Sequence, residues 1–169
     1  MTPIVSIIMG STSDLPIMEK AMKFLDEQQI PFEVNALSAH RTPAAVEDFA
    51  KHAEERGIKV IIAAAGMAAA LPGVIAASTT LPVIGVPIKG GALDGVDALY
   101  SILQMPPGIP VATVAINGAL NAAILAMQVL SLSDPAISSR FKAYKASLST
   151  KIEKANSDLR EIRYNYKTN

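Results

Sequence analysis

The 169-residue chain contains no cysteine and no tryptophan, and aromatic residues make up only 5% of it. Without cysteine the chain has neither disulfides nor thiolate metal sites, which fits a reducing compartment. Basic and acidic residues balance at 15 each, so the composition shows neither a nucleic-acid footprint nor an acidic tail. The N-terminus lacks a signal-like segment, and its apolar run 4–9 is too short to span a membrane. We therefore expect a cytoplasmic protein whose partners include neither nucleic acid nor membrane.

Short apolar runs alternate with helix-like segments along the first 133 residues, and the length suits a single domain. The predicted strands are 4–9, 32–37, 60–65, 83–86 and 111–116. The predicted helices are 15–28, 43–56, 71–79, 94–104 and 118–131. Such alternation favours βαβ crossovers, and nearly continuous apolar strands are typical of a parallel sheet buried on both faces. The sequence thus predicts the α/β class, with a doubly wound, five-stranded parallel sheet.

The C-terminal residues 134–169 read as a helical extension of an α/β catalytic domain, 1–133. Apolar residues recur there at steps of three and four: Ile137, Phe141, Tyr144, Leu148, Ile152, Ala155, Leu159, Ile162 and Tyr166. One helix of about 30 residues would reach roughly 45 Å, past its own domain and onto a neighbouring subunit. The alternative is two shorter helices folded back on the same subunit. The alanine-rich segment 119–130, apolar nearly all round, independently predicts oligomerisation.

Ligands of open parallel sheets bind outside the carboxyl ends of the strands, so the site should come from the loops there. These loops are 10–14, 38–43, 66–73, 87–94 and 117–121. The first, "GSTSD", places hydroxyls and backbone amides at a helix N-terminus, which favours a phosphate or carboxylate ligand. The alternative is that Ser13 or Asp14 only caps the helix. The segment matches neither a P-loop nor the GxGxxG pattern.

The second loop, "SAHRTP", contains two side chains suited to anion binding and proton transfer. Arg41 offers a planar fork for phosphate, and His40 carries the one side chain that ordinarily titrates near neutral pH. Thr42 and Pro43 fit a helix N-cap and first helical position. The other histidine, His52, is interpreted as a solvated helix residue. With no further histidine and no cysteine, we expect no transition-metal site.

Four motifs, "GSTSD", "SAHRTP", "AALPG" and "LYSILQMPPGIPVATVAI", together resemble the class I N5-carboxyaminoimidazole ribonucleotide mutases of bacterial purine synthesis. The resemblance covers residues 4 to 132. It implies a three-layer αβα, flavodoxin-like fold with a long C-terminal helix, and a cytoplasmic homo-octamer. It also implies an isomerase that moves a carboxylate from the exocyclic nitrogen to ring carbon C4 of an aminoimidazole ribonucleotide in IMP biosynthesis. Decarboxylation and recarboxylation would carry this reaction without a cofactor or metal.

The resemblance also assigns roles to the loop residues. His40 would be the proton shuttle, and Asp14 would hold the ribose hydroxyls. The substrate-binding residues would be Gly10, Ser11, Ser13, Asp14, Ser38, Ala39, Arg41, Gly66, Ala69 and Leu71. Ser11, Ser13 and Arg41 would hold the phosphate, and Ser38 would place the migrating carboxylate. The chemistry agrees, because C4 loses a proton while the nitrogen gains one, and small apolar residues such as Ala64 to Ala70 suit a pocket for CO2.

The third loop departs from the family pattern. Class I members usually have glycine and histidine where this chain has Met67 and Ala70. An impaired or altered mutase therefore remains an alternative, as does a class II-like carboxylase that uses CO2 directly, although Arg41 and Pro72 match class I. Two further alternatives are a flavodoxin-like electron carrier that binds FMN and a non-catalytic nucleotide-binding module. Few aromatic residues are present to flank a flavin.

Overall fold

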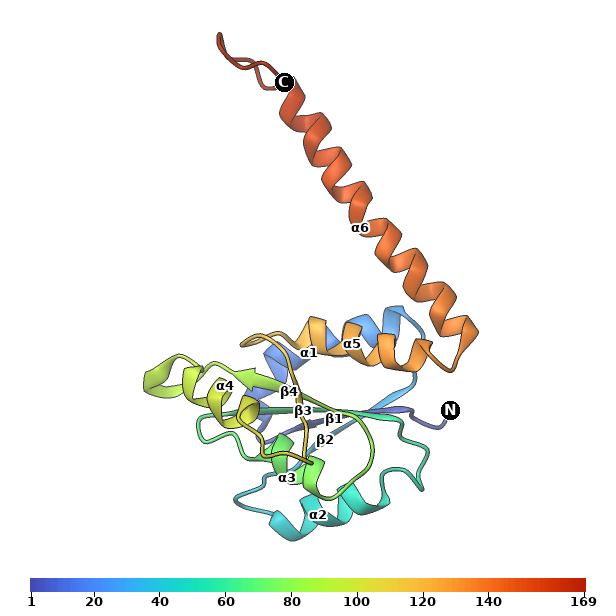
Figure 1. The fold of residues 1–169 in the computed structure, drawn as a ribbon, viewed down its shortest axis with the longest axis vertical. Coiled ribbons are helices and arrows are strands. Elements are labelled where there is room, and N and C mark those ends of the chain that lie inside the picture. The colour runs from blue at the N-terminus through green and yellow to red at the C-terminus, as the bar shows by residue number, and fades with distance from the viewer.

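The computed structural model describes residues 1–169 and shows one parallel sheet between two layers of helices (Figure 1). The strands lie in the order β2-β1-β3-β4-β5. Their bounds are β1 Val5–Met9, β2 Phe32–Ala36, β3 Val60–Gly66, β4 Val83–Ile88 and β5 Ala112–Thr113. The helices are α1 Leu15–Glu27, α2 Pro43–His52, α3 Leu71–Ala77, α4 Val96–Leu103, α5 Ala119–Ser131 and α6 Pro135–Glu161, with short 3-10 turns η1 Thr12–Asp14 and η2 Gly91–Leu93. The predicted doubly wound α/β fold is confirmed.

Each face of the sheet carries its own core. Ile7 and Ile62 pack with α1, α5 and the start of α6, whereas their neighbours Ile8 and Ile61 pack with α2, α3 and α4. All four side chains are fully buried. Successive residues of a strand face opposite sides of the sheet, so a central strand covered on both sides needs apolar residues at every position. This requirement explains the uninterrupted apolar runs of β1, β3 and β4.

The fifth strand is much shorter than predicted. The sequence predicts a strand over 111–116, but only Ala112 and Thr113 pair with β4. Beyond them, the carbonyl of Pro87 accepts a hydrogen bond from Asn117 N at 2.8 Å, so Pro87 presents its backbone toward β5. Proline has no N–H to donate on that side. The ladder therefore ends after two residues, at an edge where proline is tolerated.

Three helices are also shorter than predicted, and the predicted helix 71–79 ends at Ala77. The sequence predicts a helix over 94–104, but Asp94 and Gly95 have φ angles of 52° and 90°, in the left-handed region, and α4 begins at Val96. The predicted helix 43–56 ends at His52, and the chain then turns through Gly57 at φ 95°. Hydrophobic periodicity continues through such turns, so the sequence pattern did not reveal these ends.

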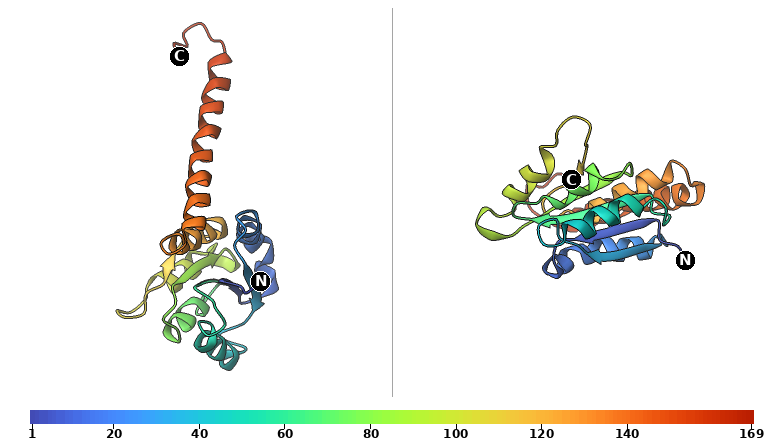
Figure 2. Two further views of the ribbon diagram at one scale, coloured as in Figure 1. Left: turned by 90° about the vertical axis from the view of Figure 1, so that its right-hand side faces the viewer. Right: turned by 90° about the horizontal axis from the view of Figure 1, so that it is seen from below.

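The C-terminal segment forms one long helix that leaves the body of the domain. Helix α6 has 27 residues and begins at an N-cap, Asp134, whose carboxylate accepts hydrogen bonds from Ala136 N and Ile137 N. Its first turns pack on α1 and α5 through Ile137, Phe141 and Tyr144. Perpendicular views show the rest standing clear of the domain (Figures 1 and 2). The alternative of two helices folded back on the same subunit is therefore wrong. No helix of the chain is both long and apolar enough to cross a membrane.

The Glu33 carboxylate links the edge strand β2 to β1 and to the turn that follows α2, and we call this arrangement the carboxylate clamp. Glu33 Oε1 accepts hydrogen bonds from the fully buried Ser6 hydroxyl at 2.9 Å and from Arg56 Nη2 at 3.0 Å. Glu33 Oε2 accepts a bond from Arg56 Nη1 at 2.9 Å, and the same guanidinium lies 5.1 Å from the centroid of the Phe49 ring. This paired arginine–carboxylate geometry is stronger than an ordinary surface ion pair.

Replacing Glu33 with alanine should lower the free energy of unfolding by about 1–3 kcal/mol, because a buried hydroxyl loses its acceptor. Urea unfolding at a fixed protein concentration measures the change. Glu47→Ala is the matched control, because Glu47 pairs only with Lys51, one turn along the exposed surface of α2. Equal effects of the two substitutions would contradict a special role for the clamp.

Candidate active site

One cleft of about 670 Å³ opens at the carboxyl ends of the first four strands. The strand order reverses between β1 and β3, which is where ligands of doubly wound sheets bind. The residues to which the resemblance assigns a role all line this cleft: Gly10, Ser11, Ser13, Asp14, Ser38, Ala39, His40, Arg41, Gly66, Ala69 and Leu71. The structure thus brings these residues together from loops that are far apart in the sequence.

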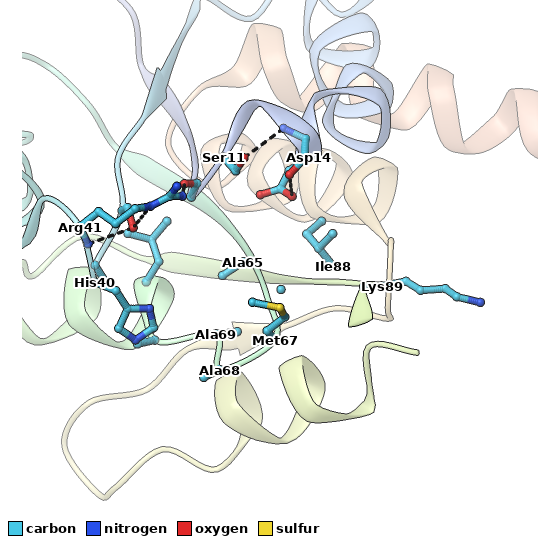
Figure 3. Close-up of a pocket in the computed structure, with 18 of the residues that line it drawn as sticks. Ser11, Asp14, His40, Arg41, Ala65, Met67, Ala68, Ala69, Ile88 and Lys89 are labelled. Carbon is cyan, nitrogen blue, oxygen red and sulfur yellow. Dashed lines mark hydrogen bonds between the residues drawn. The ribbon is translucent and has the colours of Figure 1, made fainter. Parts of the chain in front are cut away.

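The loop after β1 is held by Ser11. Its side chain accepts a hydrogen bond from Ser13 N at 3.3 Å and so caps η1, while the Asp14 side chain makes no capping hydrogen bond to α1 (Figure 3). Asp14 stands at the N-cap position of α1, but its side chain makes no capping hydrogen bond, so capping does not account for the carboxylate. The Ser13 hydroxyl instead donates to Asp14 Oδ1 at 3.3 Å. The Asp14 carboxylate lines the cleft and accepts no capping hydrogen bond from the first backbone N–H groups of α1.

Asp14 is a buried carboxyl group, with only 7% of the residue exposed. Burial raises its pKa above the ordinary value near 3.8, and hydrogen bonds from Ser13 and from the backbone of Ser11 partly offset this rise. The folded chain therefore holds the Asp14 proton more tightly than the unfolded chain does. By linkage, Asp14 stabilises the fold most at pH below the ordinary pKa, and this contribution is lost as the pH rises through the raised pKa.

At neutral pH the ionised Asp14 should therefore destabilise the folded protein, and Asp14→Asn should raise the melting temperature at pH 7. The difference from the wild type should shrink as the pH falls below the raised pKa, because the wild-type carboxyl is then neutral too. Asp26→Asn, on the exposed face of α1, controls for the loss of one negative charge. Thermal unfolding scans from pH 4 to pH 8 measure both variants. If the melting temperatures of Asp14→Asn and the wild type differed by the same amount at every pH in that range, the pH dependence could not be assigned to the Asp14 carboxyl group.

Arg41 joins the first two loops of the cleft. Its Nη2 donates to the carbonyl of Gly10 at 2.8 Å, and its Nε donates to Ser38 Oγ at 3.3 Å. The predicted N-cap Thr42 makes no capping bond to α2; its hydroxyl donates to Ser38 O at 3.1 Å and accepts from Ser38 N at 3.0 Å. Thr42 and Pro43 thus take the predicted N-cap and first helical positions of α2, while the Thr42 hydroxyl closes a turn on Ser38 instead of bonding to the helix.

The two histidines lie in different surroundings. The ring of His40 is exposed, lines the cleft and forms no hydrogen bond with the other lining residues (Figure 3). In that view it lies apart from Ser11 and Asp14, on the side of Ala68 and Ala69. His52 lies on the exposed surface of α2 with Nδ1 2.8 Å from the Asp48 carbonyl oxygen, as its interpretation as a solvated helix residue predicts.

The remaining wall of the cleft comes from the ends of β3 and β4. It is small and apolar, and is made by Ala65, Met67, Ala68, Ala69, Ala70, Leu71 and Ile88. The sequence pointed to the alanines, and Ile88 and Gly90 lie in the predicted loop 87–94 although neither was given a role. Ile17 was missed, because an apolar residue in a helix looks like a core residue. The loop 117–121, also predicted to contribute, does not line the cleft. Asn117 instead supports it, since its Oδ1 accepts a hydrogen bond from Lys89 N at 2.8 Å.

The charges of the cleft suit an anion. Arg41 and Lys89 line it, and Lys89 Nζ lies 3.1 Å from Asp94 Oδ1 in an exposed ion pair. Asp14 is the lining carboxylate. The chain contains no group of three or more side chains that could hold a metal ion. The arrangement therefore offers cationic and hydroxyl groups for an anionic ligand, a carboxylate for hydroxyl groups, and an apolar wall.

Residues 4–151 match the family described as AIR carboxylase, and this match covers most of the chain. The chain belongs to the AIR carboxylase family. The N5-carboxyaminoimidazole ribonucleotide mutase of Pyrococcus horikoshii is 54% identical over 160 residues, 95% of this chain and 90% of that protein. The Thermotoga maritima protein of the same name is 52% identical over 162 residues, 96% of this chain and 95% of the relative. The resemblance read from the motifs is confirmed.

A solved structure has the same architecture. The crystal structure of Treponema denticola PurE superposes with a TM-score of 0.85 at 35% sequence identity, over 93% of this chain and 98% of that one. Membership of the family does not favour the electron-carrier or non-catalytic alternatives. Ala70, at which this chain departs from the class I pattern, occupies the N-cap position of α3 and lines the cleft.

Proposed function

We propose that this protein interconverts N5-carboxyaminoimidazole ribonucleotide and 4-carboxy-5-aminoimidazole ribonucleotide in purine biosynthesis. Relatives more than 50% identical over nearly the whole chain are named for that mutase activity. The observation that carries the proposal is that His40, Arg41, the "GSTSD" loop and the alanine wall share one cleft at the topological switch point.

The polar side of the cleft would hold the ribose phosphate. Ser11, Ser13 and Arg41 offer hydroxyl and guanidinium donors for the phosphate oxygens. The loop precedes the 13-residue helix α1, whose N-terminal dipole adds to this attraction. Asp14 would accept hydrogen bonds from the ribose hydroxyls. Such bonds favour the ionised carboxylate and so counteract the effect of burial on its pKa.

His40 would move the one proton that the reaction transfers. Cleavage of the bond between the exocyclic nitrogen and the carboxylate carbon releases CO2 and leaves an electron pair on nitrogen, which takes a proton from His40. Ring carbon C4 then attacks CO2, and the C4 proton returns to His40. The sequence is redox-neutral and consumes no second substrate, so we propose that it needs no cofactor. Ser38 would orient the migrating carboxylate, next to the small apolar wall that encloses CO2.

Turnover of the two candidate substrates tests this proposal. N5-carboxyaminoimidazole ribonucleotide should be converted rapidly to the C4-carboxylated product, whereas aminoimidazole ribonucleotide with bicarbonate should react slowly. A faster reaction of the second pair would show a direct carboxylase instead. If neither substrate reacts until Ala70→His is introduced, this chain is an impaired mutase whose third loop lacks a required side chain.

The long helix supports the further proposal of a homo-octamer in which α6 of the extension 134–169 packs on a neighbouring subunit. Past its first turns α6 exposes the apolar side chains of Leu148, Ile152 and Leu159, and Ile152 is 64% exposed. Helix α4 likewise exposes Val96, Tyr100 and Leu103. Exposed apolar stripes of this kind are typical of subunit interfaces. The compartment, predicted to be the cytoplasm, stays a prediction.

Light scattering should therefore give a mass about eight times the 17.8 kDa of one chain. Ile152→Glu should lower that mass, because it buries a charge in the proposed interface. Thr150→Glu adds the same charge to a different face of the exposed part of α6 and should leave the mass unchanged. A single-chain mass for the wild type would contradict the octamer.

A further inference from the structure

Met67 adopts a backbone conformation that methionine ordinarily avoids. It follows β3 directly, and its φ angle is 53°, in the left-handed region. Side chains with a Cβ pay a free-energy cost there, whereas glycine does not. Strain of this kind persists where the surrounding structure imposes it, and it concentrates at functional sites. The conformation therefore raises the question of what the Met67 side chain does at this position.

The Met67 side chain lies at the edge of the cleft and reaches from one loop to the next. Met67 lines the cleft but is 62% exposed. Its Cγ and Sδ atoms lie 3.9 Å from the position that a Cβ on Gly91, in the loop after β4, would occupy. Figure 3 draws the thioether between Ala69 and Ile88, both of which belong to the apolar wall. The side chain thus extends the apolar wall outward to the solvent-exposed rim.

We infer that Met67 is a positioning residue that covers the apolar wall and keeps released CO2 in the cleft until it recombines. This inference rests on the proposed function. An uncharged molecule such as CO2 offers little for an ion pair or a strong hydrogen bond, so shape and the exclusion of water must retain it. A methionine side chain, which is unbranched and polarisable, fills an irregular opening of this kind. Proximity of CO2 to C4 is then kept during the lifetime of the intermediate.

The decarboxylated intermediate has two fates, and Met67 would decide between them. In one, C4 attacks CO2 and the product carries the carboxylate on the ring. In the other, CO2 escapes past the rim, and aminoimidazole ribonucleotide remains with its nitrogen protonated. Removing the Met67 side chain should favour the escape of CO2. It should not prevent cleavage of the bond between nitrogen and the carboxylate carbon, because His40 and Arg41 lie on another loop. The ratio of aminoimidazole ribonucleotide to C4-carboxylated product therefore measures how well Met67 retains CO2, separately from the overall rate of turnover.

The test compares the wild type, Met67→Gly and Met67→Leu, each incubated with N5-carboxyaminoimidazole ribonucleotide in bicarbonate-free buffer. The ratio of aminoimidazole ribonucleotide to C4-carboxylated product is measured, with enzyme-free loss of substrate subtracted. We expect Met67→Gly to raise this ratio about 3- to 10-fold. Met67→Leu keeps an apolar side chain and should stay near the wild-type ratio. Met67→Gly should also melt no lower than the wild type, because glycine tolerates the left-handed conformation.

Several outcomes would overturn the inference. One is a Met67→Gly enzyme that loses turnover but keeps the wild-type ratio, which would make the residue merely structural. Another is a Met67→Leu enzyme that releases as much CO2 as the glycine variant does. A wild type that does not convert the substrate at all would instead refute the proposed mutase function, and the inference with it. The wild-type measurement therefore distinguishes failure of the function from failure of the inference.

Discussion

Replacing His40 with asparagine should lower kcat for the mutase reaction by about 10²- to 10⁴-fold. Asparagine keeps a polar side chain of similar reach but cannot take up and return a proton near neutral pH. The KM should change little, because the proposed phosphate and ribose contacts belong to other lining residues, Ser11, Ser13, Asp14 and Arg41. Steady-state kinetics with N5-carboxyaminoimidazole ribonucleotide measure both constants.

The chain offers a matched control, His52→Asn, for this substitution. His52 makes its local contact with Asp48 on the exposed surface of α2, and it does not line the cleft. Its replacement should leave both constants unchanged. If His40→Asn retained full turnover, His40 would not be the proton shuttle, and the non-catalytic alternative would return. If His40→Asn and His52→Asn reduced turnover equally, the loss of turnover could not be attributed to a residue of the cleft.

Replacing Arg41 with lysine should lower kcat/KM by about 10- to 100-fold, the equivalent of losing one or two charge-assisted hydrogen bonds. The guanidinium already uses Nη2 to reach Gly10 O and Nε to reach Ser38 Oγ, and it still has donors for a phosphate. A lysine has a single nitrogen and cannot hold both loops and the ligand together. Competition by inorganic phosphate should weaken in parallel.

Arg56→Lys makes the same change outside the cleft. Arg56 pairs with Glu33 beneath the edge strand, so its replacement should reduce stability while leaving kcat/KM unchanged at a temperature where the variant is folded. An Arg41→Lys enzyme with wild-type kcat/KM and wild-type phosphate competition would show that Arg41 only fastens the loops.

The candidate site could be predicted from the sequence because its polar residues follow buried strands. Parallel strands bring their carboxyl ends to one edge of the sheet, so loops separated by 20 residues or more, such as those containing Ser11 and His40, meet there. Ser11, His40 and Arg41 also belong to motifs that resemble a known family. Ile17 of α1 carries no such signal, since a lining isoleucine and a core isoleucine look the same in sequence.

The features that the sequence could not decide depend on contacts between distant residues. The end of β5 depends on the missing N–H of Pro87 in a neighbouring strand. The Ser11 side chain caps the 3-10 turn η1 that precedes α1, and the sequence pattern gave no sign of this turn. The apolar stripe of α6 has the same period whether the helix runs straight or folds back, so only the structure separated these alternatives.

An isotope experiment shows whether the cleft moves a carboxylate within one substrate molecule. N5-carboxyaminoimidazole ribonucleotide labelled with carbon-13 in its carboxylate is turned over in unlabelled bicarbonate, and the product is analysed by mass spectrometry and carbon NMR. We expect the label to be retained in the C4 carboxylate. A product whose C4 carboxylate comes from the unlabelled bicarbonate would contradict transfer within one substrate molecule.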